Sequence, residues 1–170
     1  MHIIEMPTHP IGKAVLFGGL AAGILDAADA LVAFKVALGL DPIPIYQFVA
    51  SGMLGPSAYG GGVATALLGL AIHFLIAFSA AAVFAVASSR FEALRRAFVV
   101  SGLAYGVGVY LFMNLVVIPL SKIPPAPFSL PLLLNGVIGH ALLVGLPIAY
   151  IARSSIPPEN VGGRPLHTPV

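Results

Sequence analysis

The sequence predicts an all-α membrane protein with four transmembrane helices, and three observations support this fold class. Of the 170 residues, 59% are hydrophobic and only 8% are charged, whereas about a quarter of the residues in a soluble domain are charged. The apolar residues form four runs, each long enough to cross a hydrocarbon core of about 30 Å. Most of the prolines and charged residues lie between or outside these runs.

The first predicted span covers residues 12–38. It ends before Asp41-Pro42-Ile43-Pro44, because proline lacks a backbone N–H and restricts the residue before it. The apolar segment 45–54 is too short to cross the membrane. Its Tyr46 and Gln47 favour a short helix lying in the membrane interface, and a re-entrant helix is the alternative.

Three further predicted spans cover residues 63–88, 97–120 and 128–152. Pro131 falls in the first turn of the last span, where it is tolerated, and Pro147 is expected to kink that span. Residues 1–153 are thus predicted to form a single transmembrane four-helix bundle. Residues 154–170 are predicted to form a Pro- and Gly-rich cytoplasmic tail.

The basic residues indicate the orientation of the bundle. Arg90, Arg95 and Arg96 lie between the second and third spans, and a four-span topology puts Lys13 and Arg153 on the same side of the membrane. Positively charged loops stay in the cytoplasm. We therefore expect both termini to be cytoplasmic.

Glycines at helical spacing predict where the helices pack. Gly19 and Gly23 in the first span, and Gly102 and Gly106 in the third, form two Gly-x-x-x-Gly pairs. Such pairs lack side chains, so another helix backbone can approach closely. We expect these faces to point into the bundle.

The second and fourth spans share a different pattern. Each carries a glycine four residues before a histidine, at Gly69 and His73 and again at Gly136 and His140. Together with the glycine pairs, this suggests a two-fold parallel repeat that relates spans one and two to spans three and four. In such a repeat the two histidines are symmetry mates.

The polar side chains within the spans are expected to face the bundle interior, because an ionisable group is costly in lipid. Counting about 1.5 Å per residue from the basic ends places Asp26, Tyr110 and His140 roughly 20 Å, and His73 roughly 25 Å, into the membrane. They form one predicted layer of Asp26, Asp29, His73, Tyr110, Asn114 and His140.

Two functions are compatible with this layer. The main prediction is a hydrogen-bonded latch inside an accessory or structural subunit of a membrane assembly. The alternative is a proton-linked transporter or channel for a small solute, because coupled Asp and His groups in a membrane mark proton relays.

Two cofactor hypotheses use the same histidines. Axial histidines on facing helices can hold haem, so His73 and His140 are candidate ligands of a b-type haem. A metal ion bound by both histidines and by Asp26 or Asp29 is a further alternative, although these residues lack a diagnostic spacing. The main prediction includes neither a cofactor nor a metal.

The sequence lacks patterns typical of enzymes and of nucleic-acid-binding proteins. It has no cysteine, which excludes disulfides and thiolate metal sites. It contains no Walker loop and no H-E-x-x-H motif, and its formal charge of +2 provides no basic patch for nucleic acid. We predict no enzymatic activity. The predicted partners are lipid and either other membrane subunits or further copies of the chain.

Short motifs in three spans resemble a known family. The second span contains Ile72-His73-Phe74-Leu75-Ile76-Ala77-Phe78-Ser79, the third ends with Pro119-Leu120 before Pro124-Pro125, and the fourth contains Gly139-His140. In these motifs the chain resembles the YagU-like family over most of residues 12–153. The resemblance implies a small polytopic protein of the bacterial inner (cytoplasmic) membrane, with a link to acid tolerance in one family member. Asp26 departs from the family pattern, whereas His73 and His140 match it.

Overall fold

The structure, a computed structural model, describes residues 9–125 and 127–157. All regular structure in this part of the chain is helical. Four segments are long and apolar enough to cross a membrane: Pro10–Leu38, Gly62–Arg90, Phe98–Leu120 and Leu130–Ser155. Their bounds agree within a few residues with the predicted spans, so the prediction of a multi-pass, all-α membrane protein is confirmed.

Helix α1 (Pro10–Leu38) begins two residues before the predicted span, and helix α2 (Pro42–Leu54) begins three residues before the predicted short helix. Each starts at a proline, whose missing N–H is not needed in the first helical turn. Helix α1 stops at Gly39, which has a left-handed φ of 69° and donates its N–H to the carbonyl of Lys35. Glycine adopts this conformation without a steric penalty, so the chain turns there into α2.

A 3₁₀ turn, η1 (Gly55–Gly60), connects α2 to the second long helix, α3 (Gly62–Arg90). Phe91 is extended and separates α3 from the short helix α4 (Glu92–Arg96). Arg95 on α4 is only 6% exposed. Helix α5 (Phe98–Phe112) then returns through the bundle.

The third and fourth spans each contain a π-helical turn. In the third span, η2 (Met113–Val117) separates α5 from α6 (Ile118–Leu120). In the fourth, η3 (His140–Gly145) separates α7 (Leu130–Gly139) from α8 (Leu146–Ser155). Pro119 and Pro147 follow the two π turns closely. A proline ring clashes with the carbonyl four residues earlier in a regular helix, and the wider π turn relieves this clash.

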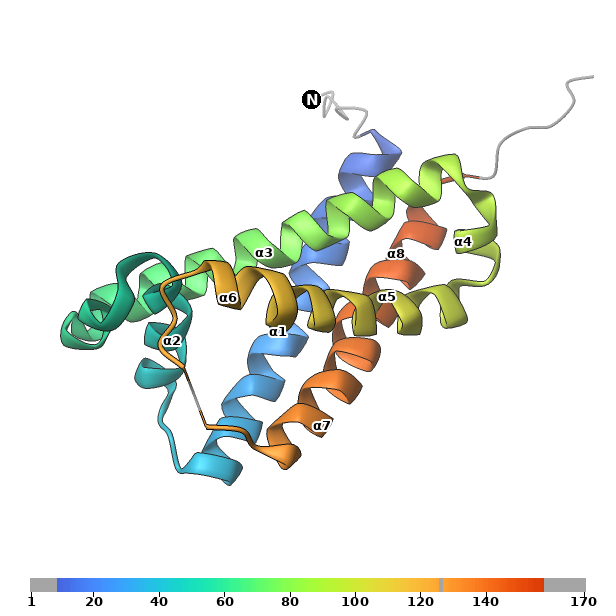
Figure 1. Cartoon of the computed structure of the whole chain (residues 1–170). Coiled ribbons are helices and arrows are strands. Elements are labelled where there is room, and N and C mark those ends of the chain that lie inside the picture. The colour runs from blue at the N-terminus through green and yellow to red at the C-terminus, as the bar shows by residue number, and fades with distance from the viewer. Residues whose placement is uncertain (1–8, 126, 158–170) are drawn as a thin grey trace, which may run out of the picture.

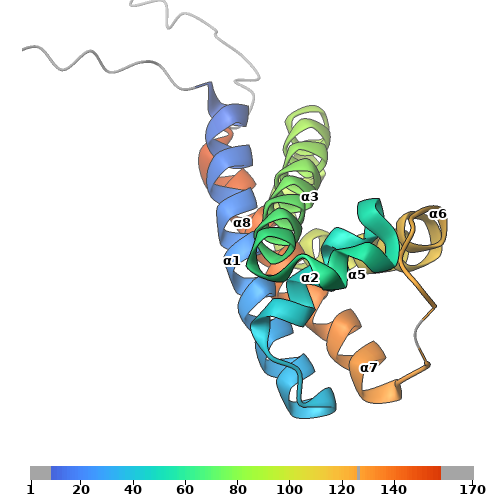
Figure 2. The same ribbon diagram turned by 90° about the vertical axis from the view of Figure 1, so that its left-hand side faces the viewer.

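The four spans form two crossing layers. Helix α1 runs beside α7 and α8 in the opposite direction, and α3 and α5 cross this pair obliquely (Figures 1 and 2). The start of α1 and the ends of α3 and α8 lie at one end of the molecule, near α4 (Figure 1). Tyr105 of α5 donates a hydrogen bond of 2.7 Å to the carbonyl of Ala80 on α3 and so joins the two crossing helices.

The core at this end of the bundle consists mainly of alanine. Small side chains let the helices approach closely, and dispersion contacts then hold them together in lipid. The buried members come from α1, α3, η3, α8 and the residue after α8: Ala14, Ala22, Ala81, Phe84, Ala85, Val144, Ile148, Ala149, Ala152 and Ile156.

Helix α2 packs along the first half of α3. Gln47, only 4% exposed, donates through Nε2 to the carbonyl of Gly62 at 2.9 Å and to Oγ1 of Thr65 at 3.2 Å. Gly69 faces the carbonyl of Tyr46 so closely that a Cβ at this position would overlap it. Gly69 therefore packs against α2, and the interfacial position predicted for α2 stays a prediction.

The predicted tail begins within the bundle. Ser154 and Ser155 are the last residues of α8, and Ile156 packs in the core with 7% exposure. The part of the tail at residues 158–170 lies outside the described residues, as do residues 1–8.

Candidate functional site

A glycine crossing places Asp26 beside His73. Where α1 crosses α3, Gly19 faces Phe78 and Gly23 faces Phe74. A Cβ on Gly23 would lie 2.6 Å from Cε1 of Phe74, closer than real atoms pack. The glycines therefore let α1 approach α3, and Asp26 lies about one turn beyond Gly23 on the same helix.

A second glycine crossing positions His140. Gly106 on α5 faces the carbonyl of His140, and a Cβ on Gly102 would lie 3.0 Å from the carbonyl of Gly145. This crossing brings two backbones together, whereas the first packs backbone against aromatic rings. Both predicted glycine pairs therefore lie at helix crossings with different packing, and the two-fold repeat stays a prediction.

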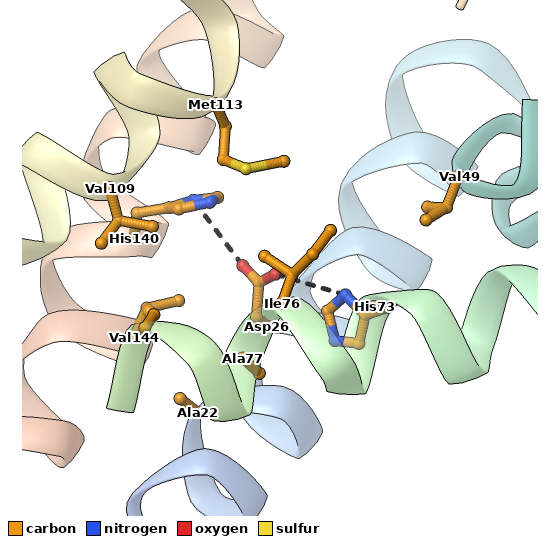
Figure 3. Close-up of a pocket in the computed structure, with 11 residues that line it drawn as sticks. Ala22, Asp26, Val49, His73, Ile76, Ala77, Val109, Met113, His140 and Val144 are labelled. Atoms are coloured by element: carbon orange, nitrogen blue, oxygen red, sulfur yellow. Dashed lines mark ion pairs between the residues drawn. The ribbon is translucent and has the colours of Figure 1, made fainter. Parts of the chain in front are cut away.

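The two histidines flank the carboxylate of Asp26 (Figure 3). Oδ1 of Asp26 lies 3.6 Å from Nδ1 of His140, and Oδ2 lies 3.9 Å from Nδ1 of His73. The side-chain exposures are 22% for Asp26, 15% for His73 and 21% for His140. We call these three residues the Asp26 triad. Its members come from α1, α3 and η3, so it joins three of the four spans.

The tautomer of His73 follows from its second contact. Nε2 lies 2.9 Å from the carbonyl oxygen of Gly23. A carbonyl only accepts hydrogen bonds, so Nε2 carries a proton and donates it. In neutral His73 the other ring nitrogen, Nδ1, is then unprotonated and presents a lone pair towards Asp26.

A cavity of about 110 Å³ adjoins the triad. Val49 of α2 and Met113 of η2 are among the side chains that line it (Figure 3). The space is large enough for a few water molecules or a small ligand. Apart from the triad, all of its lining residues are apolar: Ala22, Val49, Ile76, Ala77, Ala80, Val109, Met113 and Val144.

The other predicted layer residues do not line the cavity. Tyr110 packs edge-on against His140, with ring centroids 5.3 Å apart. Asp29 accepts a hydrogen bond of 2.7 Å from Nδ2 of Asn135 on α7. Asn114 is exposed and donates to the carbonyl of Tyr110 at 2.9 Å within its own span.

Glycines on α7 make room for these neighbouring contacts. Gly136 faces the ring of Tyr110, and a Cβ on Gly139 would lie 2.8 Å from Oδ2 of Asp29. Gly136, which was predicted to pack against another helix, thus leaves room for the ring of Tyr110. This ring packs against His140.

Helix α2 also contributes to the site, although the sequence pattern did not predict this. Val49 lines the cavity, and Tyr46 lies close enough to Asp26 for its charge to matter. Burial raises the pKa of Tyr46, and the negative charge of Asp26 raises it further. No local pattern in residues 45–54 predicts this, because it depends on how α2 docks on α3.

The geometry does not fit the haem hypothesis. Nε2 of His73 is hydrogen-bonded to the carbonyl oxygen of Gly23. Nδ1 of each histidine faces the carboxylate of Asp26, which lies between the two rings. Two axial ligands instead have to point at one iron from opposite sides of a macrocycle. Within residues 9–125 and 127–157, no group of three or more His, Asp and Glu side chains is arranged to hold a metal ion.

Comparison with known proteins finds no relatives. No family model, curated protein or solved structure matches the chain. The resemblance to the YagU-like family therefore stays a prediction.

Proposed function

We propose that the chain is a proton-linked membrane transporter or channel, in which the Asp26 triad binds the proton. The hydrogen bond between Nε2 of His73 and the carbonyl of Gly23, 2.9 Å long, is the observation that carries this proposal. It directs the lone pair of Nδ1 towards a carboxylate oxygen 3.9 Å away.

Two hydrogen-bond acceptors that face each other in an apolar span repel, and neither is well solvated there. One added proton removes the conflict. If it binds Nδ1 of His73, the pair becomes an imidazolium and a carboxylate. If it binds Asp26, the carboxylic acid can donate to the lone pair. The arrangement therefore favours the uptake of one proton by the triad.

The same proton is expected to influence how the helices pack. Asp26, His73 and His140 come from α1, α3 and η3, so a change in charge at the triad acts on three spans. His140 begins a π turn, and π turns are frequent at functional sites in helices. A proton that stabilises one packing over another shifts the population between them, as proton coupling requires.

Proton flux through reconstituted protein tests the proposal. Liposomes that contain a pH-sensitive dye and the wild-type protein are expected to dissipate an imposed pH gradient faster than protein-free liposomes. Asp26→Asn should slow this flux to the protein-free rate, because the amide keeps the shape and removes the carboxylate. Asp29→Asn is the matched control on the same helix, since Asp29 bonds to Asn135 outside the cavity. Equal rates for wild type and Asp26→Asn would contradict the proposal.

One observation favours the accessory-subunit hypothesis as a second candidate. Only 6% of the most apolar window of Phe98–Leu120 is buried in the chain, against 22% to 28% for the other spans. This wide apolar face contacts either lipid or another subunit. Co-purification of a stoichiometric partner, together with proton-tight liposomes, would support this candidate over the transporter.

A further inference from the structure

The carboxylate of Asp26 has no direct hydrogen bond from either imidazole. Its distances of 3.6 Å to His140 and 3.9 Å to His73 exceed the usual N–H···O range of about 2.7 to 3.2 Å. A carboxylate in an apolar span is costly unless a donor or a cation compensates it. A hydrogen-bond donor or a cation could therefore bridge the carboxylate of Asp26 and the two imidazoles.

Three acceptors converge on this space. They are the two oxygens of Asp26 and Nδ1 of neutral His73, whose Nε2 proton is directed to Gly23. A water molecule has two O–H donors and no net charge, so it cannot neutralise the carboxylate. A primary ammonium group, R-NH₃⁺, has three donors and one positive charge, so it satisfies all three acceptors and neutralises the carboxylate.

The walls of the cavity limit the rest of the ligand. They consist of alanine, valine, isoleucine and methionine side chains, which suit a hydrogen atom or a short alkyl group. Alkali cations prefer several oxygen ligands, and beyond Asp26 these side chains offer none. The volume of about 110 Å³ suits a small amine.

The charged and titratable groups around Asp26 are compatible with a bound cation. His73 faces it from α3 and His140 from η3. The charge of Asp26 raises the pKa of Tyr46 on α2. Tyr110 on α5 lies behind His140, and Asp29 on α1 is bonded to Asn135. None of the residues that line the cavity is Lys or Arg, so no described side chain of the cavity wall occupies the place of the cation.

We infer that the cavity beside Asp26 binds a small ammonium ion with at least three N–H groups, such as ammonium or methylammonium, in place of the proton of the triad. This inference rests on the proposed proton site, because the proton and the ammonium ion compete for the same acceptors. Binding should therefore weaken as the pH falls and the triad takes up its proton. The two ions would exchange at one site.

Equilibrium dialysis of the detergent-purified full-length chain with radiolabelled methylammonium tests the inference. Wild type and Asp29→Asn are expected to bind it saturably, and acidification should reduce the binding. Asp26→Asn should bind about tenfold more weakly or worse, because a charge-assisted contact is lost. Tetramethylammonium has the same charge but no N–H group, so it should not compete.

Two results would overturn the inference. One is equal competition by tetramethylammonium, and the other is the absence of saturable methylammonium binding to the folded wild type. Both use only the wild-type protein, so misfolding of Asp26→Asn cannot mask them. A separate ¹⁵N titration of the histidines without amine distinguishes the two proposals. If the triad takes up a proton but no amine binds, only the ammonium site is rejected. If amine binds but the triad takes up no proton, the proposed proton site is rejected.

Discussion

Nε2 of His73 lies 2.9 Å from the carbonyl oxygen of Gly23, although the two residues are 50 positions apart in the chain. This contact exists because α1 and α3 cross at glycines, where a side chain would collide with Phe74 or Phe78. It orients the imidazole and determines which of its nitrogens carries the proton. The backbone of one span thus sets the chemistry of a side chain on another.

The tautomer of His73 provides the most direct test of this contact. In ¹⁵N spectra of histidine-labelled protein, neutral His73 is expected to be protonated at Nε2, and acidification should add the second proton at Nδ1. Asp26→Asn should change this titration because it removes the facing carboxylate, whereas Asp29→Asn should leave it unchanged. Neutral His73 protonated at Nδ1 would show that the contact with Gly23 is absent.

Two glycines on α5 offer a matched pair for testing the helix crossings. Gly106→Ala should destabilise the protein by about 1 to 3 kcal/mol, because its Cβ would overlap the carbonyl of His140. Gly108→Ala has open space around the new methyl group and should be neutral or stabilising by up to about 1 kcal/mol. Denaturation midpoints in detergent measure both effects. Equal midpoints for the two variants would argue against this crossing.

The hydrogen bond between Asp29 and Asn135, 2.7 Å long, is expected to stabilise the packing of α1 against α7. Asn135→Leu leaves the half-buried carboxylate without its donor and should cost about 1 to 3 kcal/mol. The exchange of both residues, Asp29→Asn with Asn135→Asp, restores a donor and an acceptor and should recover most of this loss. Unfolding of the single and exchanged variants measures the difference. A loss that the exchange does not recover would indicate that packing, rather than this bond, matters at the site.

Tyr46 can report on the charge of Asp26 from outside the four spans. Burial and the nearby carboxylate both raise the pKa of its phenol. Removal of the negative charge by Asp26→Asn should therefore lower the pKa of Tyr46 towards its ordinary value, because the phenolate is no longer repelled. Alkaline titration of tyrosinate absorbance, with Tyr46→Phe to identify the signal, measures the change. An unchanged pKa in Asp26→Asn would mean that α2 does not dock beside Asp26.

The sequence by itself determined the four spans and, within a few residues, their ends. Hydrophobic run length, the prolines at Pro10 and Pro42, and the glycine at Gly39 act locally, so each can be predicted without knowledge of the fold. The glycine faces on spans one and three were predictable for the same reason, because helical periodicity places residues four apart on one stripe.

Only the tertiary structure decided which polar residues meet. Asp26 and Asp29 both lie on the inward side of α1, yet one faces two histidines and the other faces Asn135. Their separation depends on where α3 and η3 cross α1, which is a property of packing between distant segments. The position of Val49 at the cavity likewise depends on how α2 packs against α3. Periodicity shows which face of a helix points inward, whereas the partner across that face depends on long-range contacts that no local pattern encodes.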